Sequence, residues 1–223
     1  MDIWQPRLGI PSRGCVSYSS APCYAASSCG YGDGFCNGGA DAVVEGSLMI
    51  TLLKHCDRVR SASRAQLVNV IAPIMAEEHG PAWRQTTFYP FAEAALHARG
   101  QAYAPAISSP TIHTEAYGDV PAIDAVVTWD EQARTGLLLA VNRDANTPHT
   151  LTIDLSGLPG LPGLGTLALG KAQLLHEDDP YRTNTAEAPE AVTPQPLDIA
   201  MNATGTCTAT LPAISWISVE FHG

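Results

Sequence analysis

Cysteine is the most reactive side chain in this sequence, and its distribution is uneven. Four of the six cysteines (Cys15, Cys23, Cys29 and Cys36) lie before residue 40. Such a cluster could bind zinc or form disulfides. The intervals of seven, five and six residues contain no C-x-x-C pair, which zinc ribbons and fingers usually have. We therefore interpret these cysteines as free thiols and predict no metal site.

Two polar clusters contain the residue types of acid–base or metal chemistry. Glu77, Glu78 and His79 directly precede Gly80, which is typical of a solvated loop. The run His-Glu-Asp-Asp at 176–179 lies among predicted strands, where adjacent side chains point to opposite faces. We interpret both clusters as surface features. The sequence has no G-x-S-x-G elbow and no phosphate-binding glycine loop, so we predict no such catalytic residues and no cofactor.

Two amides interrupt an otherwise apolar stretch at 65–74, Ala-Gln-Leu-Val-Asn-Val-Ile-Ala-Pro-Ile. This composition predicts a strand that is buried on both faces, as in a parallel sheet. A buried amide bonds to the backbone or, because it both donates and accepts, to a polar ligand. For Gln66 both interpretations stay open at this point. We interpret Asn69 as a structural amide and Trp83, further along, as a packed aromatic side chain.

The composition excludes several classes of partner. Hydrophobic residues make up 45% of the 223 residues, and twelve basic against twenty-two acidic residues give a net charge of −10. Such a surface repels phosphate backbones and anionic lipids, so we predict neither nucleic-acid nor membrane binding. Residues 1–14 show no apolar core behind a basic start, which predicts no signal peptide and a cytoplasmic location.

The composition and periodicity of the sequence change twice along the chain. Residues 5–40 are rich in Gly, Ser, Ala and Cys without periodicity, which indicates either a flexible loop or a stretch translated in a shifted reading frame. Residues 41–55 and 81–98 predict helices on either side of the apolar stretch, which is an α/β texture. After Gly100 six short β-branched segments predict an antiparallel sandwich: 123–129, 136–142, 150–155, 172–176, 205–211 and 215–221. The intervening residues 178–204 predict a long surface excursion.

Several long strings resemble the C-terminal part of family 51 α-L-arabinofuranosidases. They include Ala65-Gln-Leu-Val-Asn-Val-Ile-Ala-Pro-Ile74, Trp83-Arg-Gln-Thr-Thr-Phe-Tyr-Pro-Phe91 and Leu211-Pro-Ala-Ile-Ser-Trp216. The resemblance covers residues 41–221 in the family's order. It implies that residues 41–100 form the last helix–strand–helix of a (β/α)₈ barrel. Residues 101–223 would then form a C-terminal jelly-roll β-sandwich that dominates the chain, and residues 1–40 stand apart as an irregular segment.

The resemblance implies hydrolysis of terminal arabinofuranosyl groups with retention, but this sequence lacks the family's catalytic pair. Retention needs two carboxyl groups about 5 Å apart. The family's Gly-Asn-Glu motif is absent, and the nearest counterpart of its Asp-Glu-Trp motif is Asp2-Ile3-Trp4. We therefore predict no catalytic residue and no hydrolysis by this chain alone. In the intact enzyme the resemblance implies that Gln66 contacts the arabinose of an oligosaccharide substrate from the end of the last barrel strand.

Two other functions remain open. A non-catalytic carbohydrate-binding sandwich would need a row of exposed aromatic side chains, and few aromatic residues follow residue 100, with Trp129 and Trp216 inside apolar strands. An assembly module would form a homo-oligomer through the sandwich. Because residues 41–100 would present faces made for other barrel strands, we also expect exposed apolar surface that promotes association.

Overall fold

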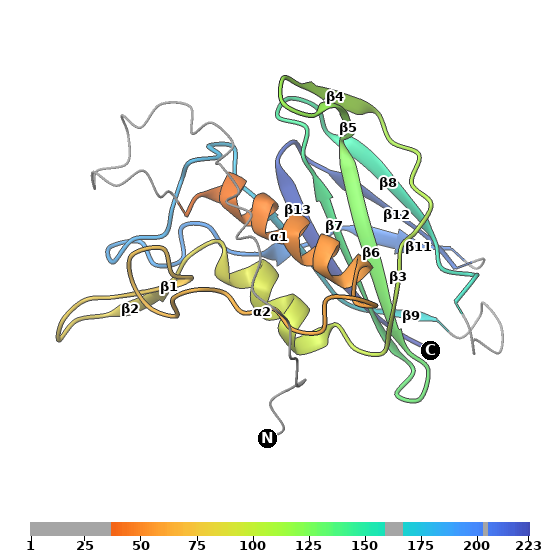
Figure 1. The fold of residues 1–223 in the computed structure, drawn as a ribbon, viewed down its shortest axis with the longest axis horizontal. Helices are drawn as coiled ribbons and strands as arrows, with labels where there is room; N and C mark the ends of the chain where they lie inside the picture. The colour runs from red at the N-terminus through yellow and green to blue at the C-terminus, as the bar shows by residue number, and fades with distance from the viewer. Residues whose placement is uncertain (1–36, 159–166, 203–204) are drawn as a thin grey trace.

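The computed structural model describes residues 37–158, 167–202 and 205–223 (Figure 1). The helices are α1 (Gly39–Lys54) and α2 (Phe88–His97). A six-stranded antiparallel sheet contains, in spatial order, β10 (Gln195–Pro196), β9 (Ala168–His176), β13 (Ser215–His222), β7 (Thr135–Asn142), β6 (Ile123–Asp130) and β3 (Gln101–Tyr103). A three-stranded sheet contains β11 (Ile199–Met201), β12 (Thr206–Leu211) and β8 (His149–Asp154). Two hairpins are separate: β1 (Ile74–Ala76) with β2 (Ala82–Arg84), and β4 (Thr111–Thr114) with β5 (Gly118–Pro121).

The six-stranded sheet is the middle of three layers, with the helices on one face and the three-stranded sheet on the other (Figure 1). Strand β7 shows the reason. Leu138 and Ala140 point into the core between the two sheets, whereas Leu137, Leu139 and Val141 point into the core beneath the helices. Because side chains alternate along a strand, a strand covered on both faces must be apolar at consecutive positions.

The predicted sandwich is confirmed, and all six predicted strands are present. Five of them agree with the prediction to within one residue at each end, and β9 begins four residues earlier. The predicted surface excursion is only partly correct, because residues 178–204 contain the short strands β10 and β11. Short strands such as these carry too few residues for their alternation to be recognised. Jelly-roll connectivity and membership of residues 41–100 in a barrel stay predictions.

The expected buried strand at 65–74 is wrong for this chain. Gln66, Asn69 and Val70 have φ values of 53°, 63° and 57°, so the backbone turns instead of extending. Pairing is limited to one parallel bridge between Val68 and Ile74, and Leu67 is 71% exposed. A central strand needs hydrogen-bonding neighbours on both sides. Beyond that bridge, the stretch accepts hydrogen bonds from outside it, from the Arg64 side chain to the Ile71 carbonyl and from the Gln85 N–H to the Pro73 carbonyl, but no strand pairs along its length among the described residues.

Both helices form, with differences from the prediction. Helix α2 begins at Phe88 instead of Pro81, because the preceding residues enter β2 and pair with β1. Helix α1 is apolar on two sides. Its buried side consists of Ala42, Val43, Gly46 and Ile50, while Val44 is 62% exposed and Leu48 47% exposed. Val44 and Leu48, which are four residues apart, therefore lie on the side of the helix that faces away from the sheet.

Gly46 sets how closely α1 approaches the sheet. A Cβ atom at this position would lie 2.3 Å from Trp216 Cδ1 and 3.2 Å from Val141 Cγ1, both on buried side chains. Gly46→Ala should therefore lower the free energy of unfolding by about 1–2 kcal/mol, because overpacking outweighs the gain in helix propensity. Urea denaturation of both proteins measures this.

The matched control is Gly157→Ala, since a Cβ atom at Gly157 would meet nothing within 4 Å. We expect its unfolding free energy to stay within about 0.5 kcal/mol of the parent. A Gly46→Ala protein that is more stable than the parent would show that α1 does not pack tightly on Trp216.

Candidate functional site

The segment that carries Gln66 is held in place by the guanidinium of Arg64. Arg64 forms an ion pair with Glu45 of α1, and both side chains are largely buried. Its Nη2 also donates to Thr87 Oγ1 at 3.2 Å and to the Ile71 carbonyl at 3.4 Å. One side chain thus connects helix α1, the residue before α2, and the turn that follows Gln66. Because these groups are partly shielded from water, their attraction exceeds that of a surface ion pair.

A cleft of about 320 Å³ lies beside this ion pair. Its polar lining consists of an amide, two carboxylates, a guanidinium and a hydroxyl, from Asn37, Asp41, Glu45, Arg64 and Thr87. Asp41 and Glu45 are four residues apart on α1 and therefore share one side of the helix. The volume is at the lower end of the range for small-molecule sites, and the lining can both donate to and accept from hydroxyl groups.

The electrostatics of the cleft centre on Asp41. Burial raises the pKa of its carboxyl group above the ordinary value of 3.8. The N–H of Gly38, which donates to Asp41 Oδ2 at 2.9 Å, and the charge of Arg64 lower that pKa again, but by less. The same Gly38 hydrogen bond closes the first turn of α1. Asp41 therefore holds the beginning of the helix and presents a carboxyl group that retains its proton more tightly than a solvated one.

Gln66 itself does not line the cleft, although Ala65 beside it does. Gln66 is exposed in a left-handed turn, and no described residue donates a hydrogen bond to its side chain or accepts one from it. The structure therefore places the predicted substrate-binding residue next to the cleft with its amide open to solvent. Its contact with a sugar stays a prediction.

Asn69 has a structural role as expected, whereas Trp83, expected to be a packed aromatic, is only half-buried and belongs to neither core. Asn69 Oδ1 accepts a hydrogen bond from the Ala76 N–H at 2.8 Å. The indole Nε1 of Trp83 donates to the carbonyl of Asn184 at 3.0 Å.

Asn184, which sequence reasoning did not single out, is almost completely buried. Its Nδ2 donates to the Arg84 and Val192 carbonyls at 2.8 and 3.0 Å, and its Oδ1 accepts from the Val192 N–H at 2.7 Å. Its carbonyl accepts a further bond from Gln85. Asn184 therefore fastens the β1–β2 hairpin to the sandwich.

The cluster at 77–80 lies at the surface as predicted, whereas His176 and Glu177 of the second cluster are half-buried. Residues 77–80 are exposed in the turn between β1 and β2. In the run 176–179, His176 pairs with Asp178 at 3.5 Å and Glu177 pairs with Arg182 at 3.2 Å. These contacts join neighbours in the chain. Neither cluster lines the cleft described above.

The aromatic residues of the sandwich lie mostly in its interior. Trp129 stacks on Phe221 with ring centroids 5.7 Å apart, and Trp216 packs beneath α1. Among the described residues after Gly100, the large aromatic side chains that are strongly exposed are Tyr117 and Tyr181, and they come from different loops. This arrangement does not favour a carbohydrate-binding sandwich, which needs aromatic side chains aligned on one surface.

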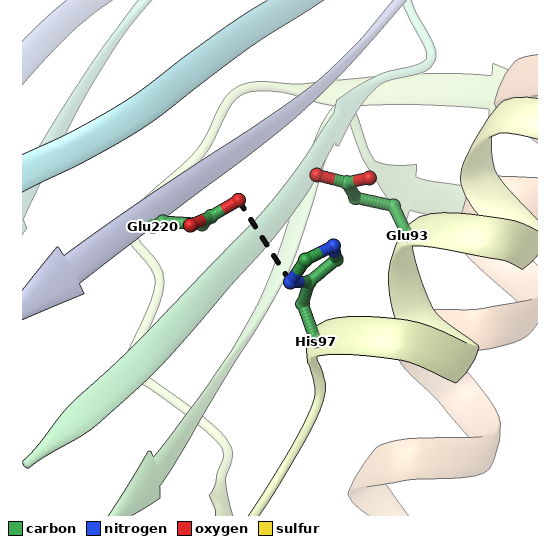
Figure 2. Close-up of side chains that lie close together, drawn as sticks. All are labelled: Glu93, His97 and Glu220. Atoms are coloured by element: carbon green, nitrogen blue, oxygen red, sulfur yellow. Dashed lines mark ion pairs between the residues drawn. The ribbon is translucent and has the colours of Figure 1, made fainter. Parts of the chain in front are cut away.

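Glu93, His97 and Glu220 are close enough to hold a metal ion (Figure 2). One ligand atom from each lies within 4.8 Å of the other two. Sequence reasoning missed this group because Glu220 follows His97 by more than a hundred residues. The spacing of Glu93 and His97 on a predicted helix was the only available signal.

Part of the predicted chemistry lies outside the described residues. This holds for Cys15, Cys23, Cys29 and Cys36 and for the string Asp2-Ile3-Trp4. Within the described part of the chain, Cys56 and Cys207 are free thiols, the first exposed and the second buried. Burial raises the pKa of the Cys207 thiol, which keeps it protonated and unreactive.

Comparison with known proteins identifies relatives over the described region. Residues 36–215 match the family described as the α-L-arabinofuranosidase C-terminal domain. An exo-α-(1→6)-L-arabinofuranosidase from Bifidobacterium longum is 47% identical over 184 residues, which are 81% of this chain and 34% of that protein. An intracellular exo-α-(1→5)-L-arabinofuranosidase from Streptomyces lividans is 44% identical over 81% of this chain and 26% of that protein.

Solved structures agree with these matches. A family 51 α-L-arabinofuranosidase from Bifidobacterium longum matches with a TM-score of 0.79 and 94% identity, over 84% of this chain and 35% of that one. A family 51 arabinofuranosidase from Xanthomonas axonopodis pv. citri, at 24% identity and a TM-score of 0.70, covers 86% of this chain and 38% of that one and shares the fold. The chain spans about a third of the length of the first curated relative and about a quarter of the second.

The raised pKa of Asp41 predicts a pH-dependent difference between the protein and its Asp41→Asn variant. A carboxyl group whose pKa is raised on folding contributes stability below its unfolded value of 3.8, and this contribution is lost as the pH rises through the folded pKa. The asparagine stays neutral and can still accept from Gly38. The variant should therefore gain unfolding free energy relative to the parent as the pH increases, which urea titrations across this range measure.

The control with the opposite sign is Asp154→Asn. Hydrogen bonds from the Ser156 side chain and backbone lower the pKa of Asp154. This group stabilises above its unfolded pKa, and that contribution is lost as the pH falls. Asp154→Asn should therefore be less stable than the parent near neutral pH, with the difference closing in acid. If Asp41→Asn followed the same trend, burial would not be the dominant influence on Asp41.

Proposed function

Because the chain belongs to the α-L-arabinofuranosidase C-terminal domain family, we propose that it forms the C-terminal part of a glycoside hydrolase. The enzyme would remove terminal α-L-arabinofuranosyl groups, with retention, from arabinoxylan or arabinan oligosaccharides. The observation that carries this proposal is the family match over residues 36–215, supported by relatives that are named exo-α-L-arabinofuranosidases. We place the protein in the cytoplasm, as supported by the relative from Streptomyces lividans that is named intracellular.

In this proposal the chain supplies structure and substrate contacts, and the catalytic carboxylates come from elsewhere. Retaining hydrolysis needs a nucleophile and a general acid about 5 Å apart and open to the substrate. Glu45 is engaged by Arg64, and Asp41 caps α1. Glu93 and Glu220 are close to each other, but neither lines the cleft. These engagements support the expectation that the chain alone does not hydrolyse arabinofuranosides.

The exposed apolar side chains beside the cleft support the presence of further protein. Leu67 and Val70 are 71% and 66% exposed, and Val44 and Leu48 of α1 are also open to solvent. Apolar side chains concentrated in this way indicate a surface that another element covers. We propose that the remaining part of a (β/α)₈ barrel covers it and gives residues 65–70 the strand neighbours that they lack here. A homo-oligomer is the alternative, and sedimentation of the assembled enzyme would distinguish the two.

Gln66 would then be the residue of this chain that touches the sugar. Its amide is free of protein partners among the described residues and can both donate to and accept from ring hydroxyls. The Arg64 contacts fix the backbone on both sides of it. This arrangement supports a role in which α1 and α2 position Gln66 for the substrate.

A chimera tests the proposed function directly. Residues 37–223 would replace the matching segment of the Bifidobacterium longum exo-α-(1→6)-L-arabinofuranosidase, to which this chain is 47% identical. We expect the chimera to release arabinose from a synthetic aryl arabinofuranoside and the isolated 223-residue chain to release none above a buffer blank. A folded chimera without activity, or an active isolated chain, would contradict the proposal.

The role of Gln66 is tested in the same chimera. Gln66→Ala should reduce kcat/KM by about tenfold, which corresponds to the loss of about one sugar hydrogen bond of roughly 1.4 kcal/mol. Gln132→Ala is the control, because Gln132 is an exposed glutamine in the β6–β7 turn. Equal kcat/KM values for the two variants would show that Gln66 does not contact the substrate.

A further inference from the structure

We propose that Glu93, His97 and Glu220 form a binding site for a zinc-class divalent cation that ties α2 to β13. The site lies between the helix layer and the six-stranded sheet and stands apart from the cleft beside Gln66. The proposal does not rest on the glycosidase role, because the cation would act as a cross-link between two elements of this chain.

Two elements deliver the three side chains to one point. Glu93 and His97 are four residues apart on α2, so they point from the same side of the helix. On β13, the alternation that directs Trp216 toward the helices also directs Glu220 toward them. Figure 2 shows the three side chains converging, with His97 Nδ1 3.8 Å from Glu220 Oε1.

Glu93 is a buried carboxylate, and only one of its two oxygens accepts hydrogen bonds from described residues. It is 8% exposed. Its Oε1 accepts from Gln173 Nε2 at 2.9 Å and from Ser218 Oγ at 3.3 Å. Its Oε2 receives no hydrogen bond from any described residue, and the carboxylate faces Glu220 across the top of His97 (Figure 2). The His97 side chain is 41% exposed and that of Glu220 21%, so an ion can reach the group from solvent, and a cation would offset the negative charge of the two carboxylates.

The strand beside Glu220 leaves this place open. β9 pairs with β13 on either side of a bulge, with Val219 opposite Ala172 and Phe221 opposite Leu169. Gly170 lies in the bulge, where an added Cβ would be 2.7 Å from His222 Nε2 and 3.1 Å from Glu220 Cβ. A larger residue at this position would push both side chains away. Bulges of this kind are common where a strand must aim a side chain at a site.

The donor set indicates the class of metal. One imidazole with two carboxylates suits zinc and similar transition-metal ions better than calcium, which prefers six or more oxygen ligands. Tetrahedral zinc ligands at about 2.0–2.2 Å lie roughly 3.4 Å from one another. The His97–Glu220 pair, at 3.8 Å, would therefore close by less than about 1 Å, and the other pairs, which lie within 4.8 Å, by at most about 1.5 Å. Gln173 and Ser218 would orient Glu93, as outer partners of metal-bound carboxylates usually do.

Zinc titration of the full chain tests the proposal. Because six cysteines offer competing thiolates, the accessible thiols would first be alkylated. We expect calorimetry to show one zinc ion bound per chain and Tm to rise with zinc concentration, because the ion binds only the folded protein. Cobalt in the same site should lack the sulfur-to-metal absorption of thiolate ligands. Absence of binding in the alkylated protein, or a cobalt spectrum with sulfur ligands alone, would overturn the proposal.

Substitutions assign the ligands. His97→Gln and Glu220→Gln should each weaken zinc binding by at least about tenfold. His113→Gln is the matched control, because His113 pairs with Asp119 at 2.8 Å on the exposed β4–β5 hairpin. Unchanged affinity in both site variants, or an equal loss in the control, would refute the assignment. If either site variant did not fold by circular dichroism, zinc-edge anomalous scattering from crystals of the parent would decide, with a peak between the three side chains expected and its absence contrary.

Discussion

The close contact between α1 and Trp216 is the constraint on which the rest of the structure depends. Gly46 has no side chain, so the helix lies directly on the indole and on Val141. This contact is part of the core beneath the helices and fixes the distance between the helix layer and the sheet. The position of α1 then determines where Glu45 meets Arg64, and hence where the turn with Gln66 lies. Helix α2, which packs beside α1, brings Glu93 and His97 over β13 in the same way.

The six-stranded sheet can serve both layers because its central strands are apolar on both faces. Leu138 and Ala140 belong to one core, and Leu137, Leu139 and Val141 belong to the other. The side chains of both cores therefore come from the same strands. If either layer unfolded, one apolar face of these strands would be exposed to water. The helix layer and the sandwich should accordingly unfold as one cooperative unit, although the sequence divides them into two textures.

The sequence predicts those parts of the fold whose information is local. The alternating and β-branched segments after Gly100 predict six strands, because their patterns lie within each segment. The stretch at 65–74 has the composition of a buried strand but turns back, because a strand depends on neighbours as well as on its own residues. The side of α1 that meets the sheet follows from Gly46 and Trp216, which are far apart in the chain. The Glu93, His97 and Glu220 group could not be predicted from a motif either, because Glu220 is also far from the other two in the sequence.

Asn184 has a consequence for the order in which the chain assembles. Its side chain and carbonyl bond to Trp83, Arg84 and Gln85, which precede it by 99 to 101 residues. It also holds Val192 through two further bonds. Closing such a long loop costs conformational entropy before the contact can stabilise the chain, so these contacts form late in folding. The β1–β2 hairpin would thus dock after the sheet, and in a nascent chain it would stay undocked until the residues near Asn184 had emerged from the ribosome.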